Sequence, residues 1–505
     1  MQRDGENKSL WQNVQMPNTS QNKSVIQYDV IIAGAGITGI TAGYLLQKAG
    51  KRCLIIEAEN IGFGTTGGTT AHINTFYDAQ YDTVISDFGE EKAKLLAQTG
   101  PEVIREIKKI IEELEIVCGF DMRDSYVFSL DEAQTKKLDK MFAATKQVGL
   151  PTEKVSVNPF PIPFDSIIKI EGQAQFHPTK YIKAVSEEFI KIGGTIITGE
   201  KVTKVSVEDE KIDIETSVSK YQAADFIWAT HVVPNINRMN FLAAPYRSYV
   251  LAFTLKSGDY PDAQGADMSE PYHYYRSQEI DGKKYVIAGG EDHKTGHEED
   301  PESCFTNLEN YVGQYFDVDE ITYRWSSQFY TPVDGLPFIG KEPGQDHIFW
   351  ATGYDGNGMT FGTLSAMMIR DLILEKENKY EKLFEPSRFN VAAGIRDTLK
   401  ENADAVFHLI GDKFRAEKID SLSEIKNDEG KTVSLKGKTM SVYRDAQGQL
   451  HAVSSACTHM GGNVGFNDTE KSWDCPCHGA RFDIEGKLLN GPATKDLEKI
   501  ELEEE

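Results

Sequence analysis

The sequence predicts an α/β protein with a parallel sheet, followed by a small all-β domain at the C-terminal end. Three observations predict this arrangement. Residues 28–59 carry a strand–helix–strand pattern around a glycine-rich turn, strands and helices alternate up to about Glu375, and short alternating strands surround a group of cysteines and histidines near the C-terminus. Alternating strands and helices favour a parallel sheet, because each crossover helix lets the next strand run in the same direction.

Length and composition limit the class of protein. The 505 residues suggest about three domains, and 40% apolar with 26% charged residues is ordinary for a globular protein. The net charge of −24 disfavours nucleic acid and anionic membranes as partners. Six cysteines are too few for a disulfide framework. Because the sequence shows neither a signal-peptide pattern nor a run of roughly 18 apolar residues, we expect a cytoplasmic protein without a membrane span.

The first strand–helix–strand unit carries a dinucleotide-binding pattern. A buried strand, Val30–Ala33, runs into Gly34-x-Gly36-x-x-Gly39 and a helix, and a second strand, Cys53–Ile56, ends at Glu57. The first glycine allows the tight turn, the second lets a pyrophosphate approach the backbone, and the third lets the helix pack closely on the strand. The helix N-terminus faces the phosphates, and Glu57 lies where a ribose hydroxyl needs an acceptor. We therefore expect all four residues to contact a dinucleotide.

Further stretches favour FAD over NAD. IGFGTTGGTTAH (61–72) follows the ribose acid, ADFIWATHVVP (224–234) is typical of a returning strand, and TPVDGLPFIG (331–340) precedes FWATGYDGNGMTFGTLSAMMIRDLI (349–373). In this order they resemble the glycine/D-amino-acid oxidase (DAO) family of FAD-dependent oxidoreductases, over about residues 28–375. The resemblance implies an FAD-binding Rossmann-like domain, at about 28–80, 165–240 and 330–375. It also implies an α+β substrate domain, at about 81–164 and 241–329.

The resemblance also implies further FAD contacts. Gly356 and Gly358 precede a predicted helix, whose N-terminus carries partial positive charge. In the family this N-terminus points at the flavin ring, where it stabilises the anionic reduced form. The further contacts implied are Thr65, Thr66, Thr70, Gly353, Gly356, Gly358, Met359 and Thr360. Whether the flavin is bound covalently, with His72 as the candidate attachment point, stays open.

The resemblance implies an amine or amino-acid-like substrate, because the family oxidises C–N bonds by hydride transfer to the flavin. An acidic substrate would need an arginine, since a guanidinium holds a carboxylate through two parallel hydrogen bonds. The candidates lie in PYRSYVLAF and PYHYYRSQ and are Arg247, Tyr249, Tyr275 and Arg276. The stretch GGEDHKTGHEED (289–300) holds histidines and acids that could bind iron, but we interpret it as a polar turn after the strand YVIAGG.

Near the C-terminus, Cys457-Thr-His459 and Cys475-Pro-Cys477-His478 are separated by 15 residues. Zinc fingers usually group cysteine with cysteine and histidine with histidine. One cysteine and one histidine from each stretch suit a binuclear cluster, with two cysteines on one iron and two histidines on the other. With the predicted hairpin before them and Gly491-Pro492-Ala493 after them, the two stretches resemble the Rieske [2Fe–2S] domain. The resemblance implies Cys457, His459, Cys475 and His478 as ligands.

The sequence therefore predicts four regions. Residues 1–27 are a polar tail that docks or stays mobile, and residues 28–375 are the FAD-dependent oxidoreductase. Residues 376–414 are a connector, and residues 415–505 are the small all-β Rieske iron–sulfur domain. Within the connector, apolar residues at helical spacing predict a helix, and they are Ala403, Val406, Phe407 and Ile410.

Joining the two cofactors on one chain predicts an electron relay. A flavin can take two electrons and release them singly, whereas a 2Fe–2S cluster carries one at a time. We expect a dehydrogenase that acts on a small-molecule substrate and passes electrons from FAD through the cluster to a one-electron carrier protein or another acceptor. Two alternatives stay open: a Rieske-type oxygenase or reductase whose cluster feeds electrons inward, and a non-catalytic redox sensor. The oxygenase would need a third iron per chain.

The C-terminal sequence also predicts a low reduction potential for the cluster. High-potential respiratory Rieske proteins have a second cysteine, disulfide-bonded to the position of Cys477, and a serine and a tyrosine that donate hydrogen bonds to sulfur. The matching residues here are Gly462, Ala480 and Phe482. Because fewer hydrogen bonds stabilise the reduced cluster less, we expect a potential in the lower part of the roughly −150 to +300 mV range. Potentiometric titration measures it, and a midpoint above about +200 mV would contradict the expectation.

Overall fold

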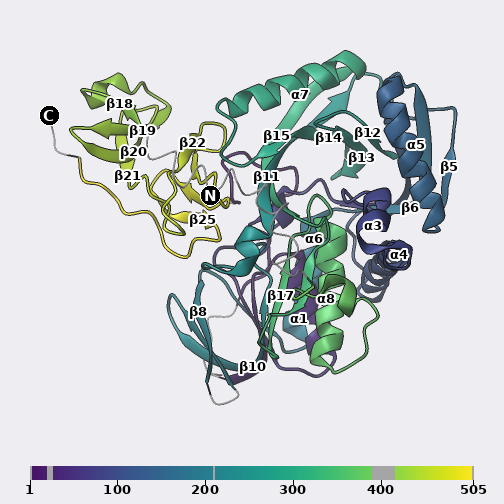
Figure 1. The fold of residues 1–505 in the computed structure, drawn as a ribbon, viewed down its shortest axis with the longest axis horizontal. Helices are drawn as coiled ribbons and strands as arrows, with labels where there is room; N and C mark the ends of the chain where they lie inside the picture. The colour runs from purple at the N-terminus through teal and green to yellow at the C-terminus, as the bar shows by residue number, and fades with distance from the viewer. Residues whose placement is uncertain (1–2, 20–26, 209–210, 389–415, 503–505) are drawn as a thin grey trace.

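The computed structural model describes residues 3–19, 27–208, 211–388 and 416–502. Residues 27–388 form a body built on two large sheets, and residues 416–502 form a C-terminal domain that lies against one side of the body (Figure 1). The predicted fold class is confirmed, because an α/β body of the dinucleotide-binding type precedes a small domain made of β-strands.

The first sheet of the body contains the dinucleotide-binding unit. Its central strand β1 pairs in parallel with β2 on one side and β10 on the other, so that Val30 lies opposite both Cys53 and Asp225. The interior of β1 is apolar, as expected of a parallel strand whose two faces are both covered. In spatial order the path runs β16 (Phe338–Lys341), β17 (Ile348–Thr352), β10 (Lys220–Trp228), β1 (Gln27–Ala33), β2 (Cys53–Ile56) and β7 (Thr195–Ile197), with β9 (Lys211–Thr216) on β10 and β8 (Val202–Glu208) on β9.

Two helices that carry predicted site residues pack on each other beside this sheet. α8 (Gly358–Ile373) lies so close to α1 (Ile37–Lys48) that a Cβ at Gly362 would come within 2.9 Å of Ile37 Cγ2. The other helices of the body are α2 (Thr65–Gly68), α3 (Tyr81–Phe88), α4 (Glu90–Glu113), α5 (Glu132–Gln147), α6 (Pro178–Lys191), α7 (Pro301–Tyr315) and α9 (Glu381–Phe384), with a 3-10 turn η1 (Arg238–Phe241).

The second sheet forms the upper part of the body in Figure 1. In spatial order it contains β15 (Val318–Pro332), β11 (Ala243–Leu255), β14 (Lys283–Lys294), β13 (Tyr274–Ile280), β12 (Gln264–Asp267), β4 (Asp121–Ser129), β6 (Ser166–Gln175) and β3 (His72–Ile73), with β5 (Thr152–Lys154) on β6. The interpretation of residues 289–300 as a turn is wrong in its first half. β14 continues through Lys294 because its backbone stays paired with β11, up to Lys294 opposite Tyr246.

The C-terminal domain consists of two small antiparallel sheets, apart from one parallel pair at an edge. One contains β18 (Glu417–Lys418), β19 (Glu429–Leu435), β20 (Lys438–Arg444) and β21 (Leu450–Val453), and the other contains β22 (Gly465–Asn467), β23 (Ser472–Asp474), β24 (Arg481–Asp483) and β25 (Leu488–Asn490). The predicted hairpin is confirmed as β20 and β21, with Ser441 opposite Val453. A 3-10 turn, η3 (Leu422–Glu424), precedes β19.

Residues 3–19, here called the N-terminal segment, are held against the body. Trp11 is fully buried, its indole Nε1 donates to the Thr69 carbonyl at 2.6 Å, and its own carbonyl accepts from Thr179 Oγ1 at 2.6 Å.

At the C-terminal limit of the body, Arg388 pairs with Asp334 through two nitrogens, each at 2.9 Å. The connector helix predicted from Ala403 to Ile410 lies outside the described residues. Among the described residues, no helix has both the length and the apolar character that crossing a bilayer requires.

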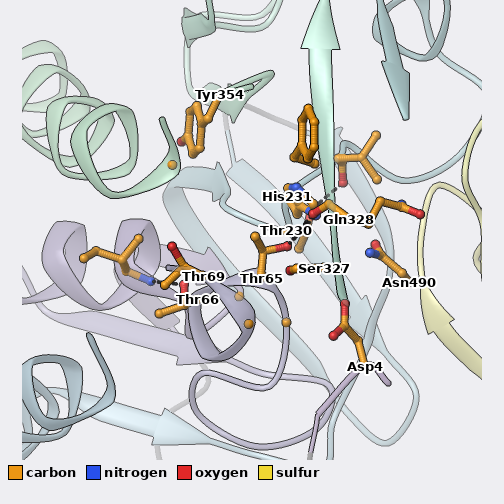
Figure 2. A pocket seen from close by; sticks show the side chains of 18 of the residues that line it. Asp4, Thr65, Thr66, Thr69, Thr230, His231, Ser327, Gln328, Tyr354 and Asn490 are labelled. Atoms are coloured by element: carbon orange, nitrogen blue, oxygen red, sulfur yellow. Dashed lines mark hydrogen bonds between the residues drawn. The ribbon is translucent and has the colours of Figure 1, made fainter. Parts of the chain in front are cut away.

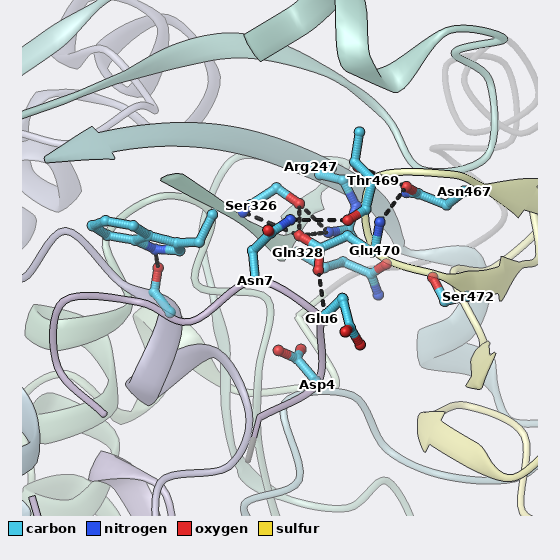
Figure 3. A network of polar contacts seen from close by, with 12 residues as sticks. Asp4, Glu6, Asn7, Arg247, Ser326, Gln328, Asn467, Thr469, Glu470 and Ser472 are labelled. Atoms are coloured by element: carbon cyan, nitrogen blue, oxygen red, sulfur yellow. Dashed lines mark hydrogen bonds and ion pairs between the residues drawn. The ribbon is translucent and has the colours of Figure 1, made fainter. Parts of the chain in front are cut away.

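A buried ionic network joins the N-terminal segment, the body and the C-terminal domain (Figure 3). Glu470 of the C-terminal domain lies 3.6 Å from Arg3 and 3.7 Å from Arg247, and it accepts from the backbone nitrogens of Glu6 (2.9 Å) and Ser326 (3.1 Å). All six charged members of the network are buried, and they are Arg3, Asp4, Arg247, Glu470, Asp474 and Arg481. Three cations therefore face three anions, all of them shielded from bulk solvent.

Removing one charge from this network should destabilise the protein. Glu470→Gln leaves Arg3 and Arg247 buried without their shared counter-charge, which costs about 3–5 kcal/mol when one partner of a buried pair is lost. Urea or thermal denaturation measures the change. As a control, Glu132→Gln removes a charge from an exposed pair with Lys136, where about 0–1 kcal/mol is expected. Equal effects of the two substitutions would show that the network contributes little.

Candidate functional site

A cavity of about 600 Å³ lies between the two sheets of the body and the C-terminal domain. One end is lined by the glycine-rich turn after β1 and by the residues that follow β2. The other end is lined by β11, by β14, by residues just before β13 and by the start of α8.

The glycine-rich turn has the shape that a pyrophosphate site requires. Gly34 has a φ of +104°, and a Cβ there would lie 2.4 Å from the Ala229 carbonyl oxygen. A Cβ at Gly39 would lie 1.9 Å from the Gly34 carbonyl oxygen, so this glycine serves the close packing of helix on strand. Gly34 and Gly36 line the cavity, while Gly39 is not among its lining residues. Each of the three glycines therefore has the physical setting expected for its part in dinucleotide binding.

Glu57 stands at the same end of the cavity. Its carboxylate accepts from the backbone nitrogens of Ala35 at 2.7 Å and Glu59 at 3.0 Å. Burial raises the pKa of Glu57, although these backbone donors lower it in part. A buried carboxylate that lines this end of the cavity fits a ribose hydroxyl as donor.

The Gly/Thr-rich loop and the start of α8 form the walls between the two ends. The predicted contacts that line the cavity here are Thr65, Thr66, Thr70, Gly356, Gly358 and Met359. Gly353 and Thr360 are not lining residues. Gly353, at a φ of +74°, turns the chain after β17, and Thr360 Oγ1 donates to the Asn74 carbonyl at 3.1 Å. His72 lines the cavity, and burial followed by the charge of Arg276 lowers its pKa to about 3, so the imidazole is neutral.

The end of the cavity away from Glu57 is acidic and aromatic. Asp78, Asp292 and Asp355 line it together with Tyr272 and Tyr274. Asp78 accepts from the Gly356 nitrogen at 2.8 Å and from the Tyr272 hydroxyl at 3.3 Å. Burial raises the pKa of each carboxyl, and the charge of Asp78 adds to the rise at Asp292, to about 7, and at Asp355. We call this set of five residues the acidic end.

The four residues predicted to bind substrate lie elsewhere. Arg247 belongs to the ionic network, and the Tyr249 hydroxyl lies 3.1 Å from His293 Nε2. The Tyr275 hydroxyl donates to Tyr311 at 2.7 Å, and Arg276 donates to the carbonyl oxygens of Ala71 at 3.0 Å and Phe176 at 3.3 Å. None of the four is among the residues that line the cavity in the described structure. Their side chains are buried within the body, with their polar groups directed to protein partners.

The four predicted cluster ligands come together in the C-terminal domain as two pairs. Cys457 is hydrogen-bonded to Cys475, and this contact, with a second from Cys477, holds the pKa of the Cys475 thiol well below its usual value. The His459 and His478 rings lie edge to face with centroids 4.8 Å apart. Among the described residues no three or more His, Cys, Asp or Glu side chains surround a single point as one metal ion would need. A cysteine pair beside a histidine pair is the arrangement of a binuclear cluster.

The two histidines have ring nitrogens to offer a metal. Both ring nitrogens of His478 are buried and lack a hydrogen-bond partner in the described structure, which is costly unless a group binds there. His459 Nε2 lies 3.3 Å from Asn240 Oδ1, a residue of the body, and metal-bound histidines typically donate their other nitrogen in this way. Gly462 lies against Cys477, where a Cβ would come within 2.6 Å of the sulfur. The residues present therefore fit a Rieske-type cluster.

The C-terminal domain also forms part of the cavity wall. Lys487, Leu488, Leu489, Asn490, Gly491, Ala493 and Asp496 all line the cavity. Figure 2 shows Asn490, from the C-terminal domain, on the opposite side of the cavity from Thr65 and Thr66. Between the cavity and the cluster stands Tyr330, whose hydroxyl lies 3.3 Å from the His478 carbonyl oxygen and whose ring lies 4.9 Å from His231, another lining residue.

Several residues that line the cavity, or that connect it with the C-terminal domain, belong to no local sequence motif from which their position could be predicted. Asp78, His231, Tyr330 and Asn490 have no signal beyond lying near predicted elements. Asp292 had none either, because the burial of YVIAGGEDHK does not alternate and the pairing of β14 with β11 shifts register between Gly290 and His293. The polar run after the glycines was therefore assigned to a turn.

Comparisons with known proteins agree with the geometry. A family model described as FAD dependent oxidoreductase matches residues 29–372, and one described as Rieske [2Fe-2S] domain matches residues 416–501. The Rieske 2Fe-2S iron-sulfur protein YhfW of Bacillus subtilis is 35% identical over 94% of both chains. Gamma-glutamylputrescine oxidoreductase of Escherichia coli is 21% identical over 72% of this chain and 88% of its own. Glycine oxidase of Geobacillus kaustophilus superposes with a TM-score of 0.63 at 16% identity, over 72% of this chain and all of its own.

The cysteine assignment predicts which substitution removes iron. Cys475→Ser should abolish the two irons per chain and leave FAD bound, because the sulfur lies in the ligand pair and far along the chain from the glycine-rich turn. Cys477→Ser is the matched control, since it changes a buried neighbouring sulfur outside the pair. Iron assay and visible absorption measure both. Loss of iron in Cys477→Ser with retention in Cys475→Ser would reverse the assignment.

Proposed function

Since the chain belongs to the FAD-dependent oxidoreductase family and ends in a Rieske [2Fe–2S] domain, we propose that it is an amine or amino-acid dehydrogenase whose electrons leave through the C-terminal domain. The cofactors of the two domains are FAD and a Rieske-type cluster. The Escherichia coli relative is named for an amine, gamma-glutamylputrescine, and this supports the substrate class.

When bound, FAD would accept the hydrogen and electron pair of the substrate C–H bond, and a cluster held by Cys457, His459, Cys475 and His478 would carry the two electrons singly to an acceptor. The nitrogen lone pair closes a C=N bond, so the product is an imine or its protonated form. Two equivalents of a one-electron acceptor take up the electrons. From a neutral amine, one proton is released when the product is the protonated imine and two when it is the neutral imine. The chain's task is to hold the substrate and to keep the electron path short and dry.

One observation carries the proposal: the C-terminal domain lines the same cavity as the glycine-rich turn. An iron–sulfur domain that only bound a partner, or only sensed redox state, would not need to form the wall of a cofactor cavity. Gln328 Nε2 donates to the Gly479 carbonyl at 2.9 Å, and the Asn235 nitrogen donates to the Pro492 carbonyl at 3.0 Å. These contacts fix the loops around the ligand pairs on the body.

Side chains of the body connect the cavity with the proposed histidine ligands. Thr65 Oγ1, on the cavity wall, lies 3.3 Å from His231 Nδ1, and the His231 ring packs edge-on against Tyr330. Tyr330 in turn lies within hydrogen-bond distance of the His478 and Gly491 carbonyl oxygens, at 3.3 and 3.2 Å. Burial lowers the pKa of His231 to about 4, so the imidazole stays neutral. This packed and uncharged path suits electron transfer.

An exit toward a partner lies on the far side of the histidine pair. The Phe241 ring stands edge-on to His478 at 5.3 Å, and 36% of Phe241 is exposed. Ile236, in the same loop, is 62% exposed. A one-electron carrier that covered these residues would come close to a cluster ligand without entering the cavity.

Anaerobic mixing tests the proposal. The oxidised holoenzyme is mixed with a panel of amines and amino acids while flavin bleaching is recorded, and then with horse-heart cytochrome c as a bulky one-electron acceptor. We expect at least one compound to bleach the flavin. Cys475→Ser should bleach at the same rate but reduce cytochrome c at least about tenfold more slowly, because the path out is broken.

The matched control is Cys477→Ser, which should reduce cytochrome c at the wild-type rate. If no member of the panel bleaches the wild-type flavin, the substrate class is wrong. The Cys475→Ser variant without iron could still reduce cytochrome c or oxygen as fast as the wild type reduces cytochrome c. In that case the electrons do not leave through the C-terminal domain.

A further inference from the structure

In the described structure, no lysine or arginine lines the acidic end of the cavity. The cationic residues that line the cavity in the described structure are Lys201 and Lys487, and both belong to the end near Glu57. Lys487 pairs with Glu59 at 2.6 Å, and Lys201 Nζ donates to the Thr494 carbonyl at 3.0 Å. His72 and His231 are neutral, because burial lowers their pKa values to about 3 and 4. A substrate carboxylate would therefore find no lining arginine or lysine at the acidic end to bind it.

Negative charge is concentrated there instead. The carboxyls of Asp78, Asp292 and Asp355 come from separate parts of the chain, yet lie close enough that Asp78 raises the pKa of both others and Asp292 raises that of Asp355. Asp355 holds its position at a φ of +51°, in the left-handed region that few residues other than glycine adopt. His273, whose ring lies behind the wall next to Glu291, is the nearest cation to Asp292, and no lysine or arginine lines this end of the cavity in the described structure. A positively charged occupant would therefore stabilise the ionised forms of the three carboxyls.

Unpartnered atoms at this end point to the same kind of occupant. Oδ1 of Asp292 is shielded from solvent and has no hydrogen-bond partner in the described structure, and Oδ1 of Asn74, another lining residue, is in the same state. Both atoms are acceptors. A ligand that satisfied them would have to bring N–H or O–H donors.

Aromatic rings complete the acidic end. Tyr272 and Tyr274 lie with ring centroids 5.6 Å apart, and Tyr274 is also 5.8 Å from the His72 ring. Their hydroxyls are already engaged, Tyr272 with Asp78 and Tyr274 with Ser248 at 2.8 Å. The Tyr274 ring packs on Gly289, and both rings line the cavity, so aromatic carbon is what they offer a ligand. Aromatic rings attract ammonium groups.

We propose that the substrate is a cationic amine, and that it places an ammonium group, not a carboxylate, at the acidic end between Asp78, Asp292, Asp355 and the rings of Tyr272 and Tyr274. This proposal rests on the proposed amine oxidation in one respect: it takes this cavity to be the substrate site. Charge attraction, donated hydrogen bonds and cation–π contact then act on the same group. An amino acid that presented its carboxylate here would meet three acids and no donor side chain of positive charge.

Binding of a quaternary ammonium tests the proposal without turnover. Oxidised holoenzyme is titrated with tetramethylammonium chloride, with sodium acetate and with tert-butanol, at constant ionic strength set with sodium chloride. Perturbation of the flavin absorption spectrum and thermal stabilisation report binding. We expect tetramethylammonium to bind and the neutral molecule of the same shape to bind at least about tenfold more weakly. Acetate should show no saturable binding.

Matched variants locate the charge. Asp292→Asn should weaken tetramethylammonium binding by about tenfold or more, since one carboxylate next to the cation is lost. Glu291→Gln is the control, because Glu291 precedes Asp292 on the same strand but faces His273, at 3.5 Å, and does not line the cavity. Flavin content confirms that each variant is folded. Unchanged binding in Asp292→Asn, or saturable acetate binding in the wild type, would overturn the proposal.

The pH dependence adds a second readout. With burial and the charge of Asp78 raising the pKa of Asp292 to about 7, the side chain is neutral below that pH and charged above it. Tetramethylammonium does not titrate, so its affinity should rise about tenfold from pH 6 to 8. The other charged groups around Asp292 are Asp78, Asp355, Glu291 and His273. Asp292→Asn should flatten the profile, and an affinity that fell with pH would contradict the assignment.

The outcomes separate this proposal from the proposed function. If tetramethylammonium binds and depends on Asp292 but no amine bleaches the flavin, the cation site stands and the oxidation fails. If amino acids without a side-chain cation bleach the flavin while cationic amines and tetramethylammonium do not bind, the oxidation stands and the cation site fails.

Discussion

The relative position of the two domains depends on the buried ionic network. Arg247 of the body lies between Glu470 at 3.7 Å and Asp474 at 3.9 Å, both of the C-terminal domain. Arg481 bonds Asp474 at 3.1 Å and reaches the Asp4 carbonyl at 2.6 Å. Burial alone would raise the pKa of Asp474, but Arg481 and Arg247 outweigh burial and lower it. Each charge is thus tolerated only because the other polypeptide segments supply its partner. A tilt of the C-terminal domain would separate these buried charges from their partners without exposing them to solvent.

This constraint explains the rest of the interface. With the C-terminal domain fixed by charges on one side, its loops can approach the body closely on the other. Gly479, at a φ of +73°, lies so near Pro245 that a Cβ would come within 2.5 Å of it, and Gly296 of the body meets Pro476 in the same manner, at 3.0 Å. Such close backbone approach leaves little space for water between the proposed cluster ligands and the cavity. Rigid docking therefore serves electron transfer and the closure of the cavity at once.

Local motifs were predictable from the sequence, and long-range partners were not. The turn from Gly34 to Gly39 and the stretches around Cys457 and Cys475 carry their geometry within a few residues, so pattern and spacing sufficed. Arg247 was predicted to bind substrate, and its ion pair with Glu470 was not predicted, because Glu470 is distant in the chain. The prediction for residues 1–27, a polar tail that docks or stays mobile, named no docking partner for the same reason. Nothing near Arg3 or Trp11 in the sequence indicates that both become buried against distant residues.

The acidic end shows how one physical cause can set both the charge state and the ligand preference of a site. Burial raises the pKa of Asp292 and lowers that of His72, so burial favours the neutral form of both the carboxyl and the imidazole. A cation that enters reverses this at the carboxyls only, because an adjacent positive charge favours the ionised acid and disfavours an ionised imidazole. The incoming charge is therefore compensated where it binds, while the histidines along the cavity wall stay neutral. A bound anion would instead need a basic side chain beside it to take up a proton. The described residues that line this end offer no base whose pKa lies close enough to neutrality to do so.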